Sequence, residues 1–241
     1  ELSRKWNKLA TQLHVDLHEI IGHGSGRLKE GVAQPHETLK NYASTIEEAR
    51  ADLFALYFAI DPKLVELGLA PSIDVGYAEY NSYITGGLIT QLARVEMGKN
   101  LEESHMRNRQ LIAKWAYEQG FKKNIIEKKR RDGKTFFVIN NHDELREIFG
   151  KLLHEVQRIK SEGDFRAAKY LIEKYGVKID RKLHQEALQR WKSLGIPKFS
   201  GFMNPVLQPI KKNGKILNIS MHYPENFSDQ MLFYAKNYSF L

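Results

Sequence analysis

The sequence contains no cysteine at any of its 241 positions. This absence excludes a disulfide framework, and it also excludes thiolate ligands for a metal ion. Any metal site in this chain must therefore be built from imidazole and carboxylate groups, which are also ordinary zinc ligands. The lack of cysteine does not by itself fix the cellular compartment.

A long apolar run is also missing. No stretch approaches the ~18 consecutive apolar residues that span a bilayer, and no charged and then apolar leader opens the chain. With 42% hydrophobic residues, the chain has enough apolar surface for one large domain or two small ones. We therefore expect a soluble, globular, cytoplasmic protein without membrane contact.

The chain has no initiator methionine, since it starts at Glu1-Leu2-Ser3-Arg4. We interpret residues 1–241 as a fragment of a longer polypeptide.

Acidic residues are the minority charge: 29 Asp and Glu stand against 37 Lys and Arg, which gives a net charge of +8. A basic excess raises nucleic acid as a partner. The densest basic run, residues 122–131, leads into Asp132-Gly133 and the apolar run Thr135–Ile139. This pattern predicts a hairpin, with Asn124–Ile126 as the partner strand. Because no recognised nucleic-acid module accompanies the run, we expect no nucleic-acid partner.

Helical periodicity dominates the rest of the chain. A second hairpin is predicted around Asn213-Gly214, where residues 206–210 and 216–220 flank the turn. We predict a mainly α fold: a multi-helix domain with small β-hairpin elements. The expected helices are residues 6–21, 44–60 with Ser44 or Thr45 as the N-cap, 77–99, 101–119, 143–161, 165–175 and 181–194.

One helix carries the segment HEIIGH, residues 18–23, which is close to the zinc pattern H-E-x-x-H. Here the two histidines are five residues apart, so a regular helix would separate His18 and His23 by roughly 140° around its axis. A single π-type bulge absorbs one extra residue, and Gly22 provides the backbone freedom for it. We predict a bulge between Ile20 and His23 that returns both rings to one face.

A catalytic zinc site usually takes three protein ligands, so a third must come from elsewhere. The next helix offers Glu47, Glu48 and Asp52, and the last two share a face because they are four apart. One of the three carboxylates can ligate while the others orient the histidines. The alternative is an acidic first turn that only stabilises the helix dipole.

The remaining histidines have weaker signals. His14 is four residues before His18 and is able to form a pair with it, but a solvated or hydrogen-bonded histidine is the simpler interpretation. We assign no chemical role to the others, which are His36, His142, His154, His184 and His222.

The segments HEIIGHGSGRL (residues 18–28) and EEARAD (residues 47–52) together resemble the dipeptidyl peptidase III family, whose signatures are HExxGH and EExRAE or EExRAD. His105-Met106 with Arg109 is similar to the H-M-x-x-R element of that family. The resemblance implies zinc ligation by His18, His23 and Glu48, with Glu19 as general base. It also implies that His105 acts in catalysis and that Arg109 binds substrate. Glu47 and Asp52 are then the residues that orient the histidines.

The resemblance further implies a zinc-dependent dipeptidyl-peptidase that releases dipeptides from the amino ends of short peptides. Family members have two lobes around a cleft. We therefore expect residues 1–241 to be the zinc-binding catalytic lobe, with the N-terminal lobe of the same chain as its missing partner. On this view the fragment binds zinc but cleaves peptides poorly. Two other functions remain open: a zinc endopeptidase of different specificity, and a non-catalytic interaction domain stabilised by the metal.

Overall fold

The computed structural model describes residues 1–196 and 202–239. The chain divides into two compact units, Glu1–Gly195 and Ile196–Leu241. Among the described residues, no helix combines the length and apolar character needed to cross a membrane.

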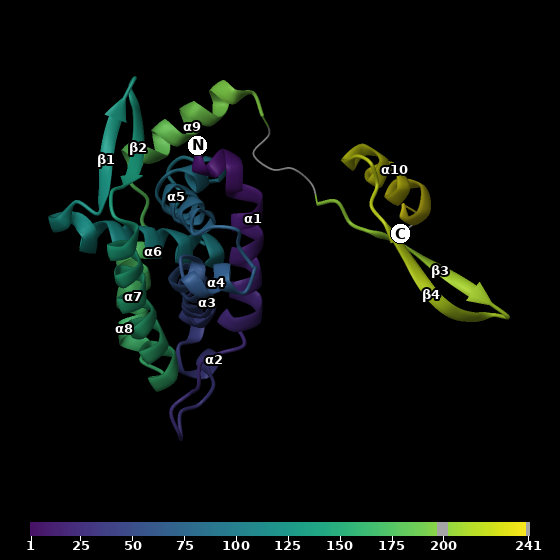
Figure 1. The fold of residues 1–241 in the computed structure, drawn as a ribbon, viewed down its shortest axis with the longest axis horizontal. Helices are drawn as coiled ribbons and strands as arrows, with labels where there is room; N and C mark the ends of the chain where they lie inside the picture. The colour runs from purple at the N-terminus through teal and green to yellow at the C-terminus, as the bar shows by residue number, and fades with distance from the viewer. Residues whose placement is uncertain (197–201, 240–241) are drawn as a thin grey trace. The chain divides into compact units, whose positions relative to one another are not determined.

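Helices form most of the first unit (Figure 1). The longer ones are α1 (Leu2–Asp16), α3 (Ala43–Ala59), α5 (Asp74–Leu88), α6 (Ser104–Gly120), α7 (His142–Glu162) and α9 (Arg181–Leu194). Shorter helices and turns connect them, namely α2 (Pro35–Thr38), η2 (Lys40–Tyr42), α4 (Pro62–Glu66), η3 (Thr90–Arg94), η4 (Phe121–Lys123), α8 (Phe165–Leu171) and η5 (Ile172–Val177).

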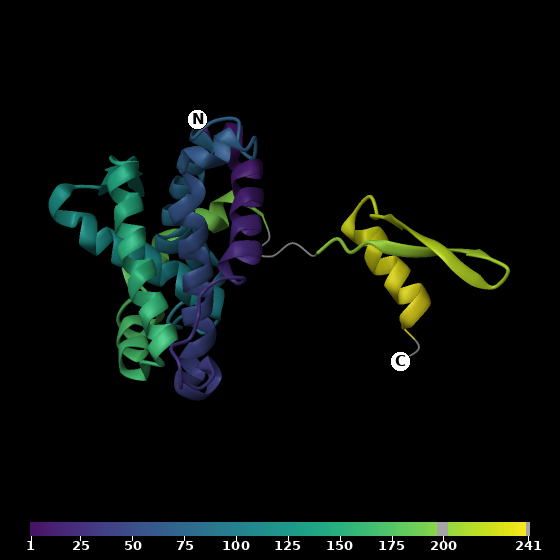
Figure 2. The same ribbon diagram turned by 60° about the horizontal axis from the view of Figure 1, so that its bottom comes forward.

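Helix α3 lies in the middle of this unit and packs against α5, α6 and α7. In both views α3 and α5 lie between α1 on one side and α7 on the other (Figures 1 and 2). The main core forms there from side chains with no exposed surface, among them Leu53, Leu56, Leu111 and Phe149. Helix α3 is buried on most sides, and its buried residues include the polar side chains of Thr45, Arg50 and Asp52.

The first hairpin differs from the prediction in its partner strand. Strand β1 (Ile126–Arg131) pairs antiparallel with β2 (Lys134–Ile139), and Ile126 is opposite Ile139. The basic run is thus part of the ladder, and the predicted partner Asn124–Ile126 overlaps the observed strand only at Ile126. Asp132 and Gly133 explain the register, because both have positive φ (50° and 71°) and form a two-residue hairpin turn.

Several helix boundaries also differ from the prediction, and those of α3 and α5 have a clear physical reason. The N-cap of α3 is Tyr42, without a side-chain hydrogen bond, because the turn η2 runs directly into the helix and leaves Thr45 inside it. Helix α5 ends at Leu88 instead of residue 99. Gly87 lets α5 approach α6 so closely that a Cβ there would lie 2.5 Å from the carbonyl oxygen of Arg109. Glycines weaken a helix, and the backbone leaves the helical conformation at Ile89.

The second unit contains the predicted hairpin around Asn213-Gly214 and one helix. Its elements are β3 (Val206–Lys212), β4 (Lys215–His222) and α10 (Phe227–Tyr238). The Gln230 side chain donates to the carbonyl of Phe202 (2.6 Å) and accepts from the backbone N–H of Asn204 (2.5 Å). These bonds tie α10 to the segment before β3. The predicted fold class, mainly α with small β-hairpins, is confirmed.

Candidate metal centre

The HEIIGH segment adopts the predicted distortion. Residues Leu17–Gly22 form a π-helix, η1, which continues directly from α1. The backbone N–H of His23 donates to the carbonyl of His18 at 2.9 Å, five residues back, which is the π-type bond. The His18 and His23 rings therefore lie on the same side, with centroids 4.7 Å apart and planes at 86°.

Gly22 allows this segment to approach α3. A Cβ at Gly22 would lie 2.9 Å from Cα of Ala51 and 3.0 Å from its Cβ. Only the pairing of glycine with alanine lets the two backbones come this close. The contact places the histidines of η1 over the carboxylates of α3.

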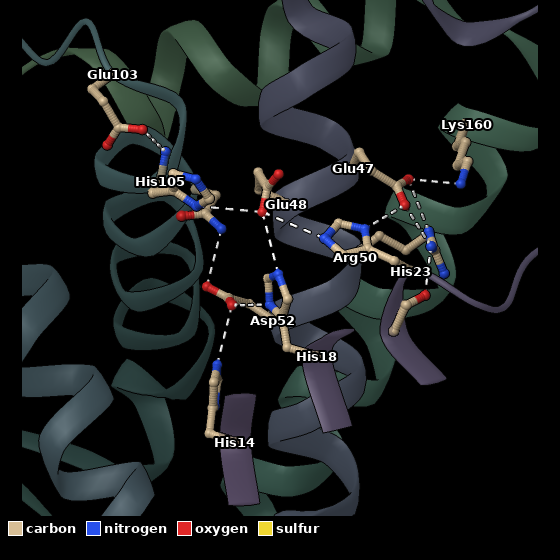
Figure 3. Close-up of polar contacts among 12 residues, drawn as sticks. His14, His18, His23, Glu47, Glu48, Arg50, Asp52, Glu103, His105 and Lys160 are labelled. Carbon is tan, nitrogen blue, oxygen red and sulfur yellow. Dashed lines mark hydrogen bonds and ion pairs between the residues drawn. The ribbon is translucent and has the colours of Figure 1, made fainter. Parts of the chain in front are cut away.

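Glu48 lies at the centre of the resulting cluster (Figure 3). Its Oε2 is 3.3 Å from Nε2 of His18, 3.8 Å from Nε2 of His23 and 3.3 Å from Nδ1 of His105. This oxygen is buried and accepts no hydrogen bond. A buried carboxylate oxygen with no hydrogen bond, faced by imidazole nitrogens, fits a cation. The set of two imidazoles and one carboxylate suits zinc.

The other nitrogen of each histidine is held by a carboxylate of α3. Nδ1 of His18 is 2.6 Å from Oδ1 of Asp52, and Nδ1 of His23 is 3.0 Å from Oε1 of Glu47. Carboxylates at these positions fix the rings and leave Nε2 of both histidines directed at Glu48. Burial lowers the pKa of His18, but Asp52 and Glu48 outweigh it and raise that pKa to about 10.

Asp52 connects several elements. Its Oδ1 also lies 3.1 Å from Nε2 of His14, and its Oδ2 accepts from the Tyr83 hydroxyl (2.6 Å) and the Asn108 amide (3.0 Å). Burial raises the pKa of Asp52, but the bonds from His14 and His18 outweigh it and hold that pKa well below its usual value. Asp52 is therefore a fixed anion.

Glu47 is held by two cations. Arg50 donates to both of its oxygens, at 3.2 and 2.7 Å, and Lys160 of α7 lies 2.6 Å from Oε2. Burial raises the pKa of Glu47, but the bonds from Arg50 and Lys160 outweigh it and lower that pKa to about 2. Arg50 is 1% exposed and also donates to the carbonyl of Gly22 (2.6 Å), so it connects the EEARAD motif to the HEIIGH motif.

The remaining predicted residues lie around this cluster. Glu19 is exposed on η1, and one of its oxygens is within 4.8 Å of a ring nitrogen of His18 and of His23. His105 is mostly exposed in the first turn of α6, which is capped by Glu103. Arg109 is one turn further along α6, with its guanidinium 5.9 Å from the centre of the Tyr83 ring. The structure thus brings the predicted residues into one region; their roles stay predictions.

Sequence reasoning gave no role to four residues that support the cluster: His14, Arg50, Tyr83 and Asn108. Arg50 had a detectable signal, because it follows Glu47 by three residues and can pair with it on a helix. Tyr83 and Asn108 had none, since α5 and α6 meet α3 only in the tertiary structure. Of the other histidines, His184 is fully buried and contacts the carbonyl of Val95 at 3.0 Å.

Comparison with known proteins gives a consistent result. The profile of Peptidase family M49 matches residues 29–192, which include EEARAD and lie after HEIIGH. Dipeptidyl peptidase 3 of Mus musculus is 25% identical over an alignment that covers 75% of this chain and 29% of the relative. The Homo sapiens protein of the same name is also 25% identical, covering 73% of this chain and 29% of the relative. The chain therefore spans less than a third of the length of these relatives.

Two solved structures share the fold. DPP III from Caldithrix abyssi superposes with a TM-score of 0.57 at 23% identity, covering 75% of this chain and 32% of that one. Dipeptidyl-peptidase III from Corallococcus sp. strain EGB gives a TM-score of 0.56 at 22% identity, covering 76% and 31%. The resemblance expected from the two motifs is confirmed. Because the family profile covers more than half of its residues, this chain belongs to peptidase family M49.

Proposed function

We propose that this chain carries the catalytic centre of a zinc-dependent dipeptidyl-peptidase that releases N-terminal dipeptides from short peptides. Membership of a peptidase family and similarity to proteins named dipeptidyl peptidase 3 support the reaction class. One observation carries the zinc part. Two imidazole Nε2 atoms face a buried Glu48 oxygen that has no hydrogen bond, while both Nδ1 atoms are held by carboxylates.

His18, His23 and Glu48 are the proposed zinc ligands. Three protein ligands are typical of catalytic zinc sites, in which a further position stays open. Zinc bound there supplies Lewis-acid chemistry: it makes water more acidic and polarises a peptide carbonyl.

The neighbouring side chains supply the proton chemistry. Glu19 is the proposed general base, because it is exposed, lies next to a proposed ligand in sequence and has an oxygen close to both rings. His105 reaches Glu48 from α6 while most of its side chain stays exposed, so it is placed to donate to a developing oxyanion. Arg109, on the same helix, is the proposed contact to bound peptide.

Regions outside these 241 residues are proposed to contribute substrate affinity, since the relatives are more than three times as long as the part they share with this chain. We therefore expect the chain alone to bind zinc but to turn over peptides slowly. A longer polypeptide that contains it should be faster. The expected cytoplasmic location stays a prediction.

Replacement of Glu19 by Gln tests the proposed function. Glu19→Gln removes the base but keeps the shape of the side chain. We therefore expect the rate of peptide hydrolysis to fall about 100-fold or more. Zinc content, measured by elemental analysis, should stay at the wild-type value. Glu66→Gln is the matched control, because Glu66 is an exposed carboxylate of α4 that pairs with Lys63 at the surface. It should change neither quantity.

The substrate comparison separates this proposal from its rivals. A dipeptidyl-peptidase cleaves peptides with a free amino end and leaves amino-blocked peptides intact. Equal cleavage of both would indicate an endopeptidase. Bound zinc without any hydrolysis by the longer polypeptide would indicate a centre that only stabilises the fold. Hydrolysis that is unaffected by Glu19→Gln would contradict the role of Glu19 as the base.

A further inference from the structure

His14 lies between two buried carboxylates, one turn before the first proposed zinc ligand. Its Nε2 is 3.1 Å from Oδ1 of Asp52, and its Nδ1 is 3.2 Å from Oε1 of Glu79. The three side chains are 11%, 7% and 9% exposed. Neither family motif includes His14 or Glu79, and the proposed mechanism gives neither a role.

The His14 ring has a fixed orientation. It stacks on Tyr83, with centroids 5.7 Å apart and planes at 29°. Tyr83 in turn donates to the other oxygen of Asp52. Nε2 of the ring lies within hydrogen-bond distance of Asp52, and Nδ1 faces Glu79 on the other side without making a hydrogen bond. A ring fixed in this way also fixes the groups it contacts.

The oxygen that His14 contacts is the one that holds His18. Oδ1 of Asp52 lies 3.1 Å from Nε2 of His14 and 2.6 Å from Nδ1 of His18 (Figure 3). His14 and His18 are four residues apart and so share a face of the helix, with ring centroids 6.1 Å apart. The side chains thus form a continuous series: Glu79, His14, Asp52, His18.

We propose that His14 is a positioning residue for the metal centre. It acts through Asp52, which it holds so that His18 directs Nε2 toward Glu48, while Glu79 lies on the far side of the ring. This inference rests on the zinc site of the proposed function. Outer partners of metal-binding histidines typically change metal affinity by about 10–100-fold, so the effect of His14 is measurable without any assay of turnover.

Two substitutions of His14 test the role. The amide of Gln in His14→Gln can replace only one of the two carboxylate contacts, whereas His14→Leu keeps apolar volume and replaces neither. We expect the zinc Kd of the 241-residue chain, measured by competition with a chelator, to rise about tenfold for Gln and up to about 100-fold for Leu. The visible spectrum of the Co²⁺-loaded chain should change as well, since it reports the ligand geometry.

His184→Gln is the matched control, because His184 is a buried histidine of the same unit with a ring contact to the carbonyl of Val95. It should lower the Tm and leave the zinc Kd within about twofold of wild type. A rise in the zinc Kd that is specific to the His14 variants therefore cannot be explained by a general loss of stability.

The outcomes separate the two proposals. A wild-type chain that binds no zinc would contradict the proposed function itself. A wild-type chain that binds zinc, with a Kd within twofold in His14→Gln and an unchanged Co²⁺ spectrum, would overturn the role of His14. Where His14→Leu fails to fold by circular dichroism, His14→Gln decides alone.

Discussion

Each of the two proposed zinc-binding histidines is held at Nδ1 by a carboxylate of α3, and that carboxylate is itself held by further residues. Glu47 shows this clearly, since it holds His23 with one oxygen and is itself held by Arg50 and Lys160. Such second contacts decide which ring nitrogen is free to ligate. At the scale of single residues, the site therefore depends on Arg50 and Asp52 as much as on the ligands.

Replacement of Arg50 by Ala tests this dependence. The change leaves Glu47 partly buried with one fewer cation and leaves the carbonyl of Gly22 without its donor. We expect the free energy of unfolding to fall by about 3 kcal/mol.

Urea unfolding followed by circular dichroism measures the loss. Arg158→Ala is the control, because Arg158 also pairs with several carboxylates but sits at the surface. There the loss should stay below about 1 kcal/mol. Similar losses in both variants would contradict a special role for Arg50.

Much of the site was predictable at the residue scale, because the two motifs are local in sequence. Spacing and ligand chemistry singled out His18, His23, Glu47, Glu48 and Asp52. The residues that support Asp52 were not predictable. Tyr83 and Asn108 are 31 and 56 residues from it, and nothing local marks them. His14 had a helical spacing from His18, but that spacing alone does not separate a site residue from a solvated one.

At the scale of elements, the π-helix η1 is the feature that makes HEIIGH geometrically possible. The extra residue costs one regular α-helical bond, and the bond from His23 to His18 replaces it. Gly22 then lets η1 pack on α3 at Ala51. The helix type, the glycine and the alanine are parts of one packing arrangement.

Replacement of Gly22 by Ala should separate η1 from α3. The added Cβ would lie 2.9 Å from the backbone of Ala51, which must then move. We expect a loss of about 1–3 kcal/mol in the free energy of unfolding and weaker zinc binding.

Gly86→Ala is the control for this change, since a Cβ at Gly86 in α5 meets only Cδ of Arg109, at 3.8 Å. Alanine favours helix by up to about 1 kcal/mol relative to glycine, so that variant should be as stable as the wild type or more so. If Gly22→Ala kept full stability and zinc affinity, the close packing of η1 on α3 would be refuted.

The charged side chain of Asp61 connects α4 to α7. It caps α4 by accepting from the N–H of Lys63 (2.9 Å), and Arg146 of α7 donates to its other oxygen (2.6 Å). These bonds, the backbone one first, hold the pKa of Asp61 below its usual 3.8. A lowered carboxyl pKa adds stability above pH 3.8, and that stability is lost as the pH falls through the folded-state pKa.

Replacement of Asp61 by Asn isolates this charge, because Asn also caps helices. At about pH 7 the wild type should be more stable than Asp61→Asn, and the difference should shrink as the pH falls toward about 3. Urea unfolding at several pH values gives the comparison. A difference that stayed constant with pH would show that the charge of Asp61 plays no part.

Element types were predictable from periodicity, but element ends were not. The hairpin of β1 and β2 shows why: the basic run looked like a solvated tip, yet the positive φ at Asp132 and Gly133 draws it into the ladder. Likewise, α5 stops where Gly87 packs on α6, a contact between segments more than 20 residues apart. Tertiary packing set these boundaries, and the local sequence contains little information about tertiary packing.

For the whole molecule, one compact unit contains the complete candidate centre. All the proposed ligands and their supporting residues lie within Glu1–Gly195, and the family match at 29–192 falls in the same unit. The unit Ile196–Leu241 has its own hairpin and helix. Zinc binding should therefore be a property of the first unit, whatever other regions add to peptide binding.

The most direct measurement is the position of zinc in crystals of the zinc-loaded chain, located by anomalous scattering at the zinc edge and combined with elemental analysis. We predict one zinc ion per chain, at about 2 Å from Nε2 of His18, Nε2 of His23 and an oxygen of Glu48. Zinc bound elsewhere, or no zinc peak at these three side chains in a loaded sample, would contradict the account.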